Sequence, residues 1–303
     1  MSALATLVAR GGERVVEHAP LGARTTYRVG GSARVWVTLS SLHDLEELGG
    51  LMMETGLACV MVGNGSNLLV EDGEHDVLAV HLDGDFSDLA WRDEGDDVLV
   101  DAGGGLDLPV AARRLASAGV VGFEWAVGVP GTFGGAVAMN AGGHGSDMAA
   151  SLDHVDLWNA RVETRSKDQL EFGYRTSAVR RGDLVVRATL RLRRGDAEEA
   201  QERVREIVRW RREHQPGGPN GGSVFTNPPG DHAARLIEAA GCKGLRHGSA
   251  QVSEKHANFI QADAQGRAYD VYELMNIVRE RVEANSGVTL VSEHRFVGYG
   301  ATP

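Results

Sequence analysis

Two glycine-rich loops constrain what this chain can fold into more than any other feature. Residues 63–67 read Gly-Asn-Gly-Ser-Asn after a short apolar stretch, and residues 128–135 read Gly-Val-Pro-Gly-Thr-Phe-Gly-Gly. Glycine lets the backbone adopt positive φ and approach a ligand closely, so the N–H groups of such a loop can converge on phosphate oxygens. Together the two loops predict a site for a dinucleotide cofactor.

Neither loop follows the better-known nucleotide-binding fingerprints. Leu68 stands where a G-x-G-x-x-G sequence would have its third glycine, and no G-x-x-x-x-G-K-[ST] sequence occurs in the chain. Because the chain has 40 glycines, any one cluster is explained equally well as a turn. A third cluster, at residues 141–145, favours a ligand cradle over three unrelated turns.

The composition is that of a folded, acidic protein. A length of 303 residues with 42% hydrophobic residues is enough for two or three domains with real cores. A formal net charge of -11 argues against nucleic acid as a partner, because the field of the protein repels polyanions. With no signal peptide and no apolar run of membrane-spanning length, we expect a cytoplasmic protein without membrane insertion. Cys59, Cys242 and the histidines lack metal-ligand spacing, so no metal is expected.

The hydrophobic pattern predicts mixed helices and strands without a regular βαβ rhythm. Capping signals predict helices at residues 41–56, 107–118 and 231–241, and a further helix opened by Asp270 with Glu273 in the capping-box position. An amphipathic pattern predicts another helix at 198–214. Alternating or continuous apolar runs predict a buried strand at 58–62, strands at 68–70 and 184–193, a hairpin of 89–91 with 98–100, an extended segment at 251–262 and a last strand at 293–298. The Gly/Pro segment at residues 216–222 predicts a domain boundary.

Three further segments place a polar residue in an apolar or glycine-rich context. They are residues 172–177 with Arg175, 221–228 with Ser223, and 292–296 with Glu293. Taken singly, each residue has a simpler explanation: Arg175 as a loop cation, Ser223 as a turn residue and Glu293 as a solvated strand position. Their occurrence together with the glycine loops favours a catalytic site.

The set of motifs resembles the UDP-N-acetylenolpyruvoylglucosamine reductase family, flavoenzymes of peptidoglycan precursor synthesis. The resemblance spans nearly the whole chain in order: residues 26–31, 63–67, 128–142, 174–175, 222–225 and 293–295. It implies an α+β, two-lobed FAD-binding fold of the vanillyl-alcohol-oxidase/PCMH type with a C-terminal α+β substrate domain. It further implies FAD-binding lobes at 1–80 and 81–213 and a substrate domain at 214–303, whose last strand returns to the active site. The direct passage from Arg175 to the strand at 184 fits the short form of the family, which lacks a substrate-covering insertion.

The resemblance also implies the reaction. NADPH reduces bound FAD and leaves, and hydride then passes to the enolpyruvyl methylene carbon of UDP-N-acetylglucosamine enolpyruvate, giving UDP-N-acetylmuramate. Hydride addition pushes electron density into the neighbouring carboxylate, so a positive group is needed there to stabilise the charge. The carbon next to the carboxylate needs a proton donor. Arg175 and Glu293 match the charge-stabilising residues of the family, and Ser223 matches its proton donor.

The family's binding residues are carried over position by position. The first glycine loop contains no histidine, so the FAD is expected to be noncovalent. The residues expected to bind FAD are Gly63, Asn64, Gly65, Ser66, Asn67, Leu68, Gly128, Val129, Gly131, Thr132, Gly134, Gly135, Ala136, Asn140, Ala141 and Gly142. The residues expected to bind the UDP-sugar are Asn227, Lys255, His256, Asn258 and Arg295. Thr226 and Asn227 replace basic residues common at these positions in the short form, so the cation that contacts the substrate diphosphate is left open between Lys255 and Arg295.

Two alternative functions stay open on the sequence alone. An FAD-linked oxidase of the same broad fold would act on a sugar or alcohol, consume oxygen and need no proton donor at Ser223. A nucleotide-sensing module without turnover would have no use for Arg175, Ser223 and Glu293 together.

Overall fold

The computed structural model describes residues 8, 12–55, 58–180 and 182–299. By internal contacts the chain forms two compact units, each built from separate stretches of sequence. Unit 1 comprises residues 1–17, 35–63 and 77–211, and unit 2 comprises residues 18–34, 64–76 and 212–303. The chain thus passes between the units at 17/18, 34/35, 63/64, 76/77 and 211/212.

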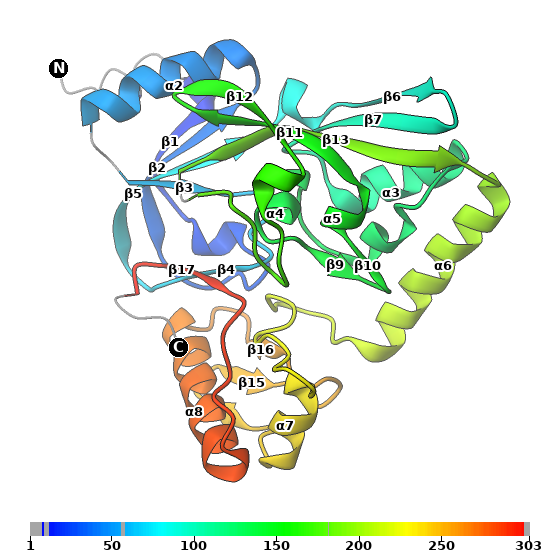
Figure 1. Ribbon diagram of the computed structural model, residues 1–303. Helices are drawn as coiled ribbons and strands as arrows, with labels where there is room; N and C mark the ends of the chain where they lie inside the picture. Colours follow the sequence, from blue (N-terminus) through cyan, green and yellow to red (C-terminus); the bar gives the residue numbers. More distant parts are fainter. Residues whose placement is uncertain (1–7, 9–11, 56–57, 181, 300–303) are drawn as a thin grey trace. The chain divides into compact units, whose positions relative to one another are not determined.

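The core of unit 1 is covered by an antiparallel sheet with strand order β12-β11-β13-β7-β6, to which β8 adds by pairing with β13 (Figure 1). The long strand β13 alternates buried aliphatic with exposed basic residues along its second half, which is the pattern of a strand with one face in the core. Its elements are β6 (Leu89–Glu94), β7 (Asp97–Gly103), β8 (Val120–Val121), β11 (Leu152–Asn159), β12 (Arg161–Ser166) and β13 (Leu184–Arg194).

Short helices pack against one face of this sheet. Phe133 of α4 is fully buried and stacks on Phe123 with 5.4 Å between ring centroids. These aromatic side chains hold the second glycine loop against the sheet. The elements of this layer are α3 (Leu108–Ser117), the 3-10 helix η4 (Glu124–Gly128), α4 (Phe133–Ala138), β9 (Gly142–Gly143), β10 (Ser146–Asp147), α5 (Met148–Ser151) and α6 (Ala197–His214).

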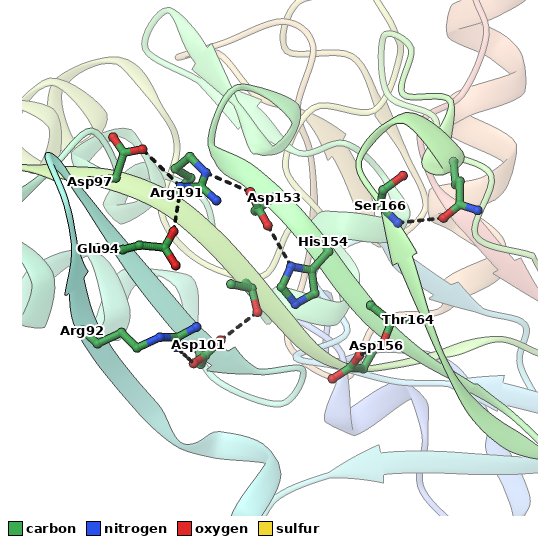
Figure 2. A network of polar contacts seen from close by, with 12 residues as sticks. Arg92, Glu94, Asp97, Asp101, Asp153, His154, Asp156, Thr164, Ser166 and Arg191 are labelled. Carbon is green, nitrogen blue, oxygen red and sulfur yellow. Dashed lines mark hydrogen bonds and ion pairs between the residues drawn. The ribbon is translucent and has the colours of Figure 1, made fainter.

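Charged side chains of neighbouring strands meet on this sheet in a network of ion pairs, shown in Figure 2. Arg191 donates to Asp153 at 2.9 Å, to Glu94 at 3.0 Å and to Asp97 at 3.2 Å. Nδ1 of His154 lies 2.9 Å from Asp153. All of these side chains are substantially exposed, so each pair contributes at most about 1 kcal/mol to stability.

A second sheet has strand order β1-β2-β5-β3. Its strands are β1 (Val15–Ala19), β2 (Ser32–Leu39), β3 (Ala58–Met61) and β5 (Glu74–Leu82), and helix α2 (Leu42–Thr55) follows β2. The predicted capping box is present, because the amide N–H of Ser41 donates to Asp44 at 3.0 Å and that of Asp44 donates to Ser41 Oγ at 3.3 Å. The strand predicted at 58–62 exists, but the prediction that it is buried is wrong, because β3 is one of the two edge strands and Ala58 is exposed.

Unit 2 combines a small antiparallel sheet of order β14-β15-β16 with helices α7 and α8. Apart from it, β17 pairs in parallel with β4, with Arg295 opposite Leu68 and Val297 opposite Val70. The elements are β4 (Leu68–Val70), α7 (Ala233–Ala239), β14 (Arg246–His247), β15 (Ala250–Val252), β16 (Ile260–Ala262), α8 (Ala268–Ser286) and β17 (Arg295–Val297). The strand β17 therefore pairs with β4, the strand that directly follows the first glycine loop.

The start of α8 departs from the sequence prediction. Asp72 accepts hydrogen bonds from the N–H groups of Ala268 at 3.2 Å and Tyr269 at 3.1 Å, and so caps the helix. The predicted cap Asp270 lies inside the helix and instead accepts from the backbone and hydroxyl of Ser249. The capping assignment of Asp270 and Glu273 is wrong, because a carboxylate distant in sequence occupies the helix start.

The remaining predicted elements are present with shifted ends. The helices at 107–118, 198–214 and 231–241, the hairpin of β6 and β7, and the strands at 68–70, 184–193 and 293–298 are confirmed as α3, α6, α7, β6–β7, β4, β13 and β17. The extended segment at 251–262 proves to be two antiparallel strands, β15 and β16, joined by a loop. The three predicted domains stay a prediction; the contact boundary at 211/212 lies close to the predicted 213/214, whereas residues 18–34 and 64–76 belong to the unit of the C-terminal segment.

Candidate active site

Two backbone donors of the first glycine loop, at Gly65 and Asn67, are open in the described part of the chain. Gly65 has φ +60°, and a Cβ there would lie 2.7 Å from Cα of Thr25, so only glycine fits. Within the described residues, the backbone N–H groups of Gly65 and Asn67 make no hydrogen bond, and Gly65 is buried. A buried N–H without a protein partner favours an external acceptor such as a phosphate oxygen.

Gly63, at the start of the loop, belongs to unit 1. A Cβ on Gly63 would lie 2.4 Å from Oγ1 of Thr132, which is buried at the start of α4. Glycine at 63 therefore lets the chain pass close to Thr132 within that unit.

The second glycine loop is arranged differently from the predicted nest. The N–H groups of Phe133 and Gly134 donate to the carbonyl oxygens of Leu106 at 3.0 Å and Gly104 at 2.8 Å. Because these two N–H groups are already bonded inside unit 1, they are not available to hydrogen-bond a ligand. This part of the loop can still let a ligand approach its backbone closely. Gly135 supplies such a surface, because it is exposed and a Cβ there would meet only Thr132 Oγ1, at 3.8 Å.

Asn140, a predicted FAD ligand, is buried and makes hydrogen bonds within the protein. Its Nδ2 donates to the carbonyl of Gly173 at 2.9 Å, and its Oδ1 accepts from the N–H of Ala149 at 3.0 Å. The amide therefore ties the segment 140–149 to the turn that precedes Arg175.

Arg175 stands on a tight turn. Gly173 and Thr176 exchange backbone hydrogen bonds of 3.0 and 3.3 Å across it, and Arg175 has φ +58°. Its guanidinium donates to the carbonyl of Gly142 at 3.1 Å and lies 5.4 Å from the ring centroid of Tyr174. Two contacts within unit 1 thus position Arg175. The Asn140 amide holds the turn on which it stands, and the carbonyl of Gly142 holds its guanidinium.

Ser223 and Glu293 lie on paired segments of unit 2. The N–H of Glu293 donates to the carbonyl of Val224 at 2.8 Å, and Phe225 forms a bridge with Ser292. Ser223 is half-buried, and its hydroxyl makes no hydrogen bond to any of the described residues. A hydroxyl in that state is free to meet a substrate.

His294 and Tyr27 were not assigned roles from the sequence, yet they form a buried network beside Glu293. Nδ1 of His294 lies 2.8 Å from Oδ1 of Asn67, and Nε2 lies 2.9 Å from the Tyr27 hydroxyl. Burial lowers the pKa of His294 to about 4, so the ring is neutral at pH 7. Nδ2 of Asn67 in turn donates to the carbonyl of Glu293 at 2.8 Å. The only sequence signal was their position inside the motifs at 26–31 and 293–295.

Three of the predicted substrate residues have structural partners of their own. Oδ1 of Asn227 accepts from the N–H of Ala233 at 3.0 Å, at the start of α7. Asn258 is buried and holds the backbone of Phe225 through hydrogen bonds of 3.0 and 2.8 Å. His256 packs edge-on against Phe259, and burial lowers the pKa of its imidazole. Through these bonds to the backbone of Phe225, Asn258 fixes the segment that carries Ser223.

The two cationic candidates, Lys255 and Arg295, are exposed. Nζ of Lys255 donates to the carbonyl of Arg212. The backbone N–H of Arg295 donates to the carbonyl of Asn67 at 2.9 Å. Both side chains keep a charged end near the surface of unit 2, so either can supply the cation for the substrate diphosphate.

The structure brings two of the three predicted catalytic residues onto neighbouring segments. Ser223 and Glu293 belong to unit 2, and Arg175 belongs to unit 1. The gathering of all three around one ligand stays a prediction. Among the described residues no group of three or more His, Cys, Asp or Glu side chains could hold a metal ion. No helix in the described ranges is both long and apolar enough to cross a bilayer.

The site residues fit a diphosphate-bearing cofactor. The open N–H groups of Gly65 and Asn67 are the observation that supports this fit. Residues 33–164 match the family model described as FAD binding domain. The chain is therefore a flavoprotein with an FAD-binding domain, as the predicted fold class required.

The second match and the relatives define the family more narrowly. Residues 213–297 match the model of the C-terminal domain of UDP-N-acetylenolpyruvoylglucosamine reductase. The chain is 41% identical over 288 residues to the UDP-N-acetylenolpyruvoylglucosamine reductase of Heliobacterium modesticaldum, which covers 93% of this chain and 90% of that protein. The enzyme of the same name from Rubrobacter xylanophilus is 41% identical over 282 residues, covering 92% of this chain and 94% of that protein. The chain belongs to the UDP-N-acetylenolpyruvoylglucosamine reductase family.

Solved structures agree with this assignment. The crystal structure of UDP-N-acetylenolpyruvylglucosamine reductase from Thermus caldophilus has a TM-score of 0.79 and 36% identity, covering 93% of this chain and 98% of that chain. The Physcomitrella patens BBE-like 1 protein, at 14% identity, has a TM-score of 0.58 and covers 96% of this chain and 90% of that chain. The second likeness concerns the fold alone.

Proposed function

We propose that this protein reduces UDP-N-acetylglucosamine enolpyruvate to UDP-N-acetylmuramate with NADPH as the reductant. The observation that carries the proposal is a relationship of about 41% identity over more than nine tenths of this chain to enzymes of that name, together with Ser223 and Glu293 on paired segments. We place the reaction in the cytoplasm, where nucleotide-activated sugars and NADPH are found.

The backbone donors at Gly65 and Asn67 and the open surface at Gly135 would hold FAD without a covalent bond. A bound FAD supplies the hydride, which the side chains of the protein cannot. The remaining chemistry falls to the protein, because hydride addition at the methylene carbon drives negative charge into the substrate carboxylate.

Arg175 has the properties that charge stabilisation requires. Its guanidinium is held in place by Gly142 before any substrate binds, so little reorganisation is needed when the carboxylate charge develops. Glu293 has its backbone fixed on both sides, through Val224 and Asn67, and acts as the second polar group at the developing charge.

Ser223 then protonates the carbon next to the carboxylate. A serine hydroxyl is a weak acid, but an enolate carbon is a strong base, and positioning supplies the rest. The free hydroxyl of Ser223 and its fixed neighbours Val224 and Phe225 suit that task. The serine oxygen recovers its proton from solvent when product leaves.

A spectroscopic experiment tests the proposal. The purified protein should show a flavin spectrum that acid releases, and anaerobic NADPH should bleach it. Addition of the UDP enolpyruvyl sugar should restore the oxidised spectrum and yield UDP-N-acetylmuramate. Reoxidation by oxygen during turnover of an alcohol or sugar, with no response to the enolpyruvyl sugar, would identify an oxidase instead. Protein without extractable flavin would point to a nucleotide-sensing module.

A further inference from the structure

Four groups of unit 2 form a continuous hydrogen-bonded chain. It runs from the hydroxyl of Tyr27 to Nε2 of His294 at 2.9 Å, and from Nδ1 of His294 to Oδ1 of Asn67 at 2.8 Å. From Nδ2 of Asn67 it continues to the carbonyl of Glu293 at 2.8 Å. We call these groups the His294 relay. It connects the first glycine loop with the backbone of a predicted catalytic residue.

The carbonyl at the end of the relay fixes the direction of the hydrogen bonds that Asn67 makes. The carbonyl of Glu293 only accepts, so Asn67 must direct its NH2 group toward Glu293 and its oxygen toward His294. The oxygen of Asn67 also only accepts, so Nδ1 of His294 must carry a proton. In the neutral ring, Nε2 is then an acceptor, and the Tyr27 hydroxyl donates to it. Of the two neutral tautomers, only the one with the proton on Nδ1 satisfies the whole relay.

Burial holds both ends of the relay in that form. His294 and Tyr27 are buried, and burial lowers the pKa of His294 to about 4. Burial also raises the pKa of Tyr27 above its ordinary value, an effect that a hydrogen bond with the backbone of Gly221 partly offsets. At neutral pH the tyrosine therefore keeps its proton and the histidine gains none.

The segment of Ser223 packs on the same two rings. A Cβ on Gly221 would lie 2.5 Å from Cε2 of Tyr27 and 2.9 Å from the His294 ring, so only glycine lets this segment approach them. The rings meet edge to face, with 5.5 Å between centroids. The relay thus touches three structures that the reaction needs: the first glycine loop, Glu293 and the Ser223 segment.

We propose that His294 is a positioning residue of the reduction, which acts through the side chain of Asn67 to hold the backbone of Glu293 in place. The inference rests on the proposed function, because it concerns the step that Glu293 serves. His294 touches neither substrate nor flavin in this assignment. Its loss should slow transfer to the enolpyruvyl sugar and leave reduction of the flavin by NADPH unchanged.

Two substitutions at one position separate this role from simple filling of the core. His294→Asn keeps an N–H donor near the place of Nδ1 but leaves a smaller side chain. His294→Leu nearly preserves the volume and suits a buried site, but it has no donor. Relay function predicts that His294→Asn stays within about tenfold of the wild type, whereas His294→Leu slows reoxidation by substrate about 10²-fold, as a misplacement near 1 Å does. Core filling predicts the opposite order.

The measurements use the holoenzyme. Stopped-flow absorbance follows flavin reduction by NADPH and reoxidation by the UDP enolpyruvyl sugar as separate steps. Nitrogen-15 NMR of labelled histidine reports which ring nitrogen of His294 carries the proton, independently of turnover. We expect protonated Nδ1 and unprotonated Nε2 at pH 7. A proton on Nε2, a charged ring, equal loss in both steps, or His294→Leu faster than His294→Asn would overturn the proposal.

Tyr27→Phe covers the case in which neither His294 variant folds. It removes a single hydroxyl and leaves the aromatic ring in place, and we expect reoxidation about tenfold slower, equal to about 1.4 kcal/mol and within the worth of one hydrogen bond. An unchanged rate would overturn the proposal. If the wild type fails to respond to the enolpyruvyl sugar, the proposed function fails, while the NMR result still decides whether the relay exists.

Discussion

The side-chain amide of Asn140 donates a hydrogen bond of 2.9 Å to the carbonyl oxygen of Gly173, two residues before Arg175. Asn140, which the family resemblance assigns to flavin binding, thus holds the turn that carries Arg175, a predicted catalytic residue. Asn67 makes the equivalent tie in unit 2, where it donates to the carbonyl of Glu293. Asn67 thus fixes the backbone of Glu293 itself, and Asn140 fixes the turn that carries Arg175.

Asn140→Ala should therefore impair the step that uses Arg175. The substitution leaves the carbonyl of Gly173 and the N–H of Ala149 without their partner, so we expect a loss of about 1–3 kcal/mol in unfolding free energy. We also expect slower reoxidation by the enolpyruvyl sugar with near-normal affinity for FAD. Denaturant unfolding and single-turnover absorbance measure the two effects. A fall in FAD affinity with reoxidation unchanged would show that Asn140 is a flavin ligand after all.

The sequence predicted those features whose partners are close in the chain. The capping box of α2 joins Ser41 to Asp44 and was found from their spacing alone. The cap of α8 joins Asp72 to Ala268, 196 residues apart, and no local pattern reports such a contact. The roles of Tyr27 and His294 were missed for the same reason, since the two residues are 267 apart. The family resemblance supplied the residue types of the site but not the hydrogen bonds that connect them.

Ser223→Ala tests the assigned proton donor. The free hydroxyl of Ser223 supports no other described residue, so its removal should leave the fold and flavin reduction by NADPH near normal. Reoxidation by the substrate should slow by about 10²–10⁴, the usual contribution of a general acid. Rapid-mixing absorbance measures both steps. Equal loss in the two steps would refute the role given to the serine.

Gly135→Ala tests whether the flavin approaches α4. The added methyl group meets only Thr132 Oγ1, at 3.8 Å, and alanine suits a helix better than glycine by about 0.5–1 kcal/mol. The flavin-free protein should therefore be as stable as the wild type or more so. If the cofactor lies against this surface, its affinity should fall at least about tenfold, or 1.4 kcal/mol. Fluorescence titration with FAD measures the affinity, and an unchanged value would remove Gly135 from the binding site.

Asp72→Ala should destabilise unit 2 through the start of α8. Two backbone donors lose their acceptor, so we expect a loss of about 0.5–2 kcal/mol in unfolding free energy. Glu273→Ala is the matched control, because it alters the carboxylate that sequence reasoning gave to the cap. Urea unfolding of the two variants compares them. A larger loss for Glu273→Ala than for Asp72→Ala would contradict the cap described here.

The buried His294 predicts a pH dependence of stability. Its pKa is about 4 in the folded protein and near 6.5 in the unfolded chain, so below pH 6.5 the unfolded state binds more protons. The stabilising contribution is complete above pH 6.5 and declines as the pH falls toward 4. Between pH 7 and pH 4.5 the wild type should lose about 2.4 kcal/mol more than His294→Asn, which cannot titrate. Denaturant titrations at both pH values measure this difference, and parallel losses in the two proteins would contradict it.

The pairing of β4 with β17 has a consequence for how the protein is made. Residues 18–34 and 64–76 leave the ribosome early, but the partners that complete their unit lie at 212–303. The nascent chain must therefore carry Leu69 and Val70, both fully buried in the folded protein, without their final covering until β17 has been synthesised. A fragment that begins at residue 213, where the C-terminal family match begins, would lack the same partners and be a poor choice for separate expression.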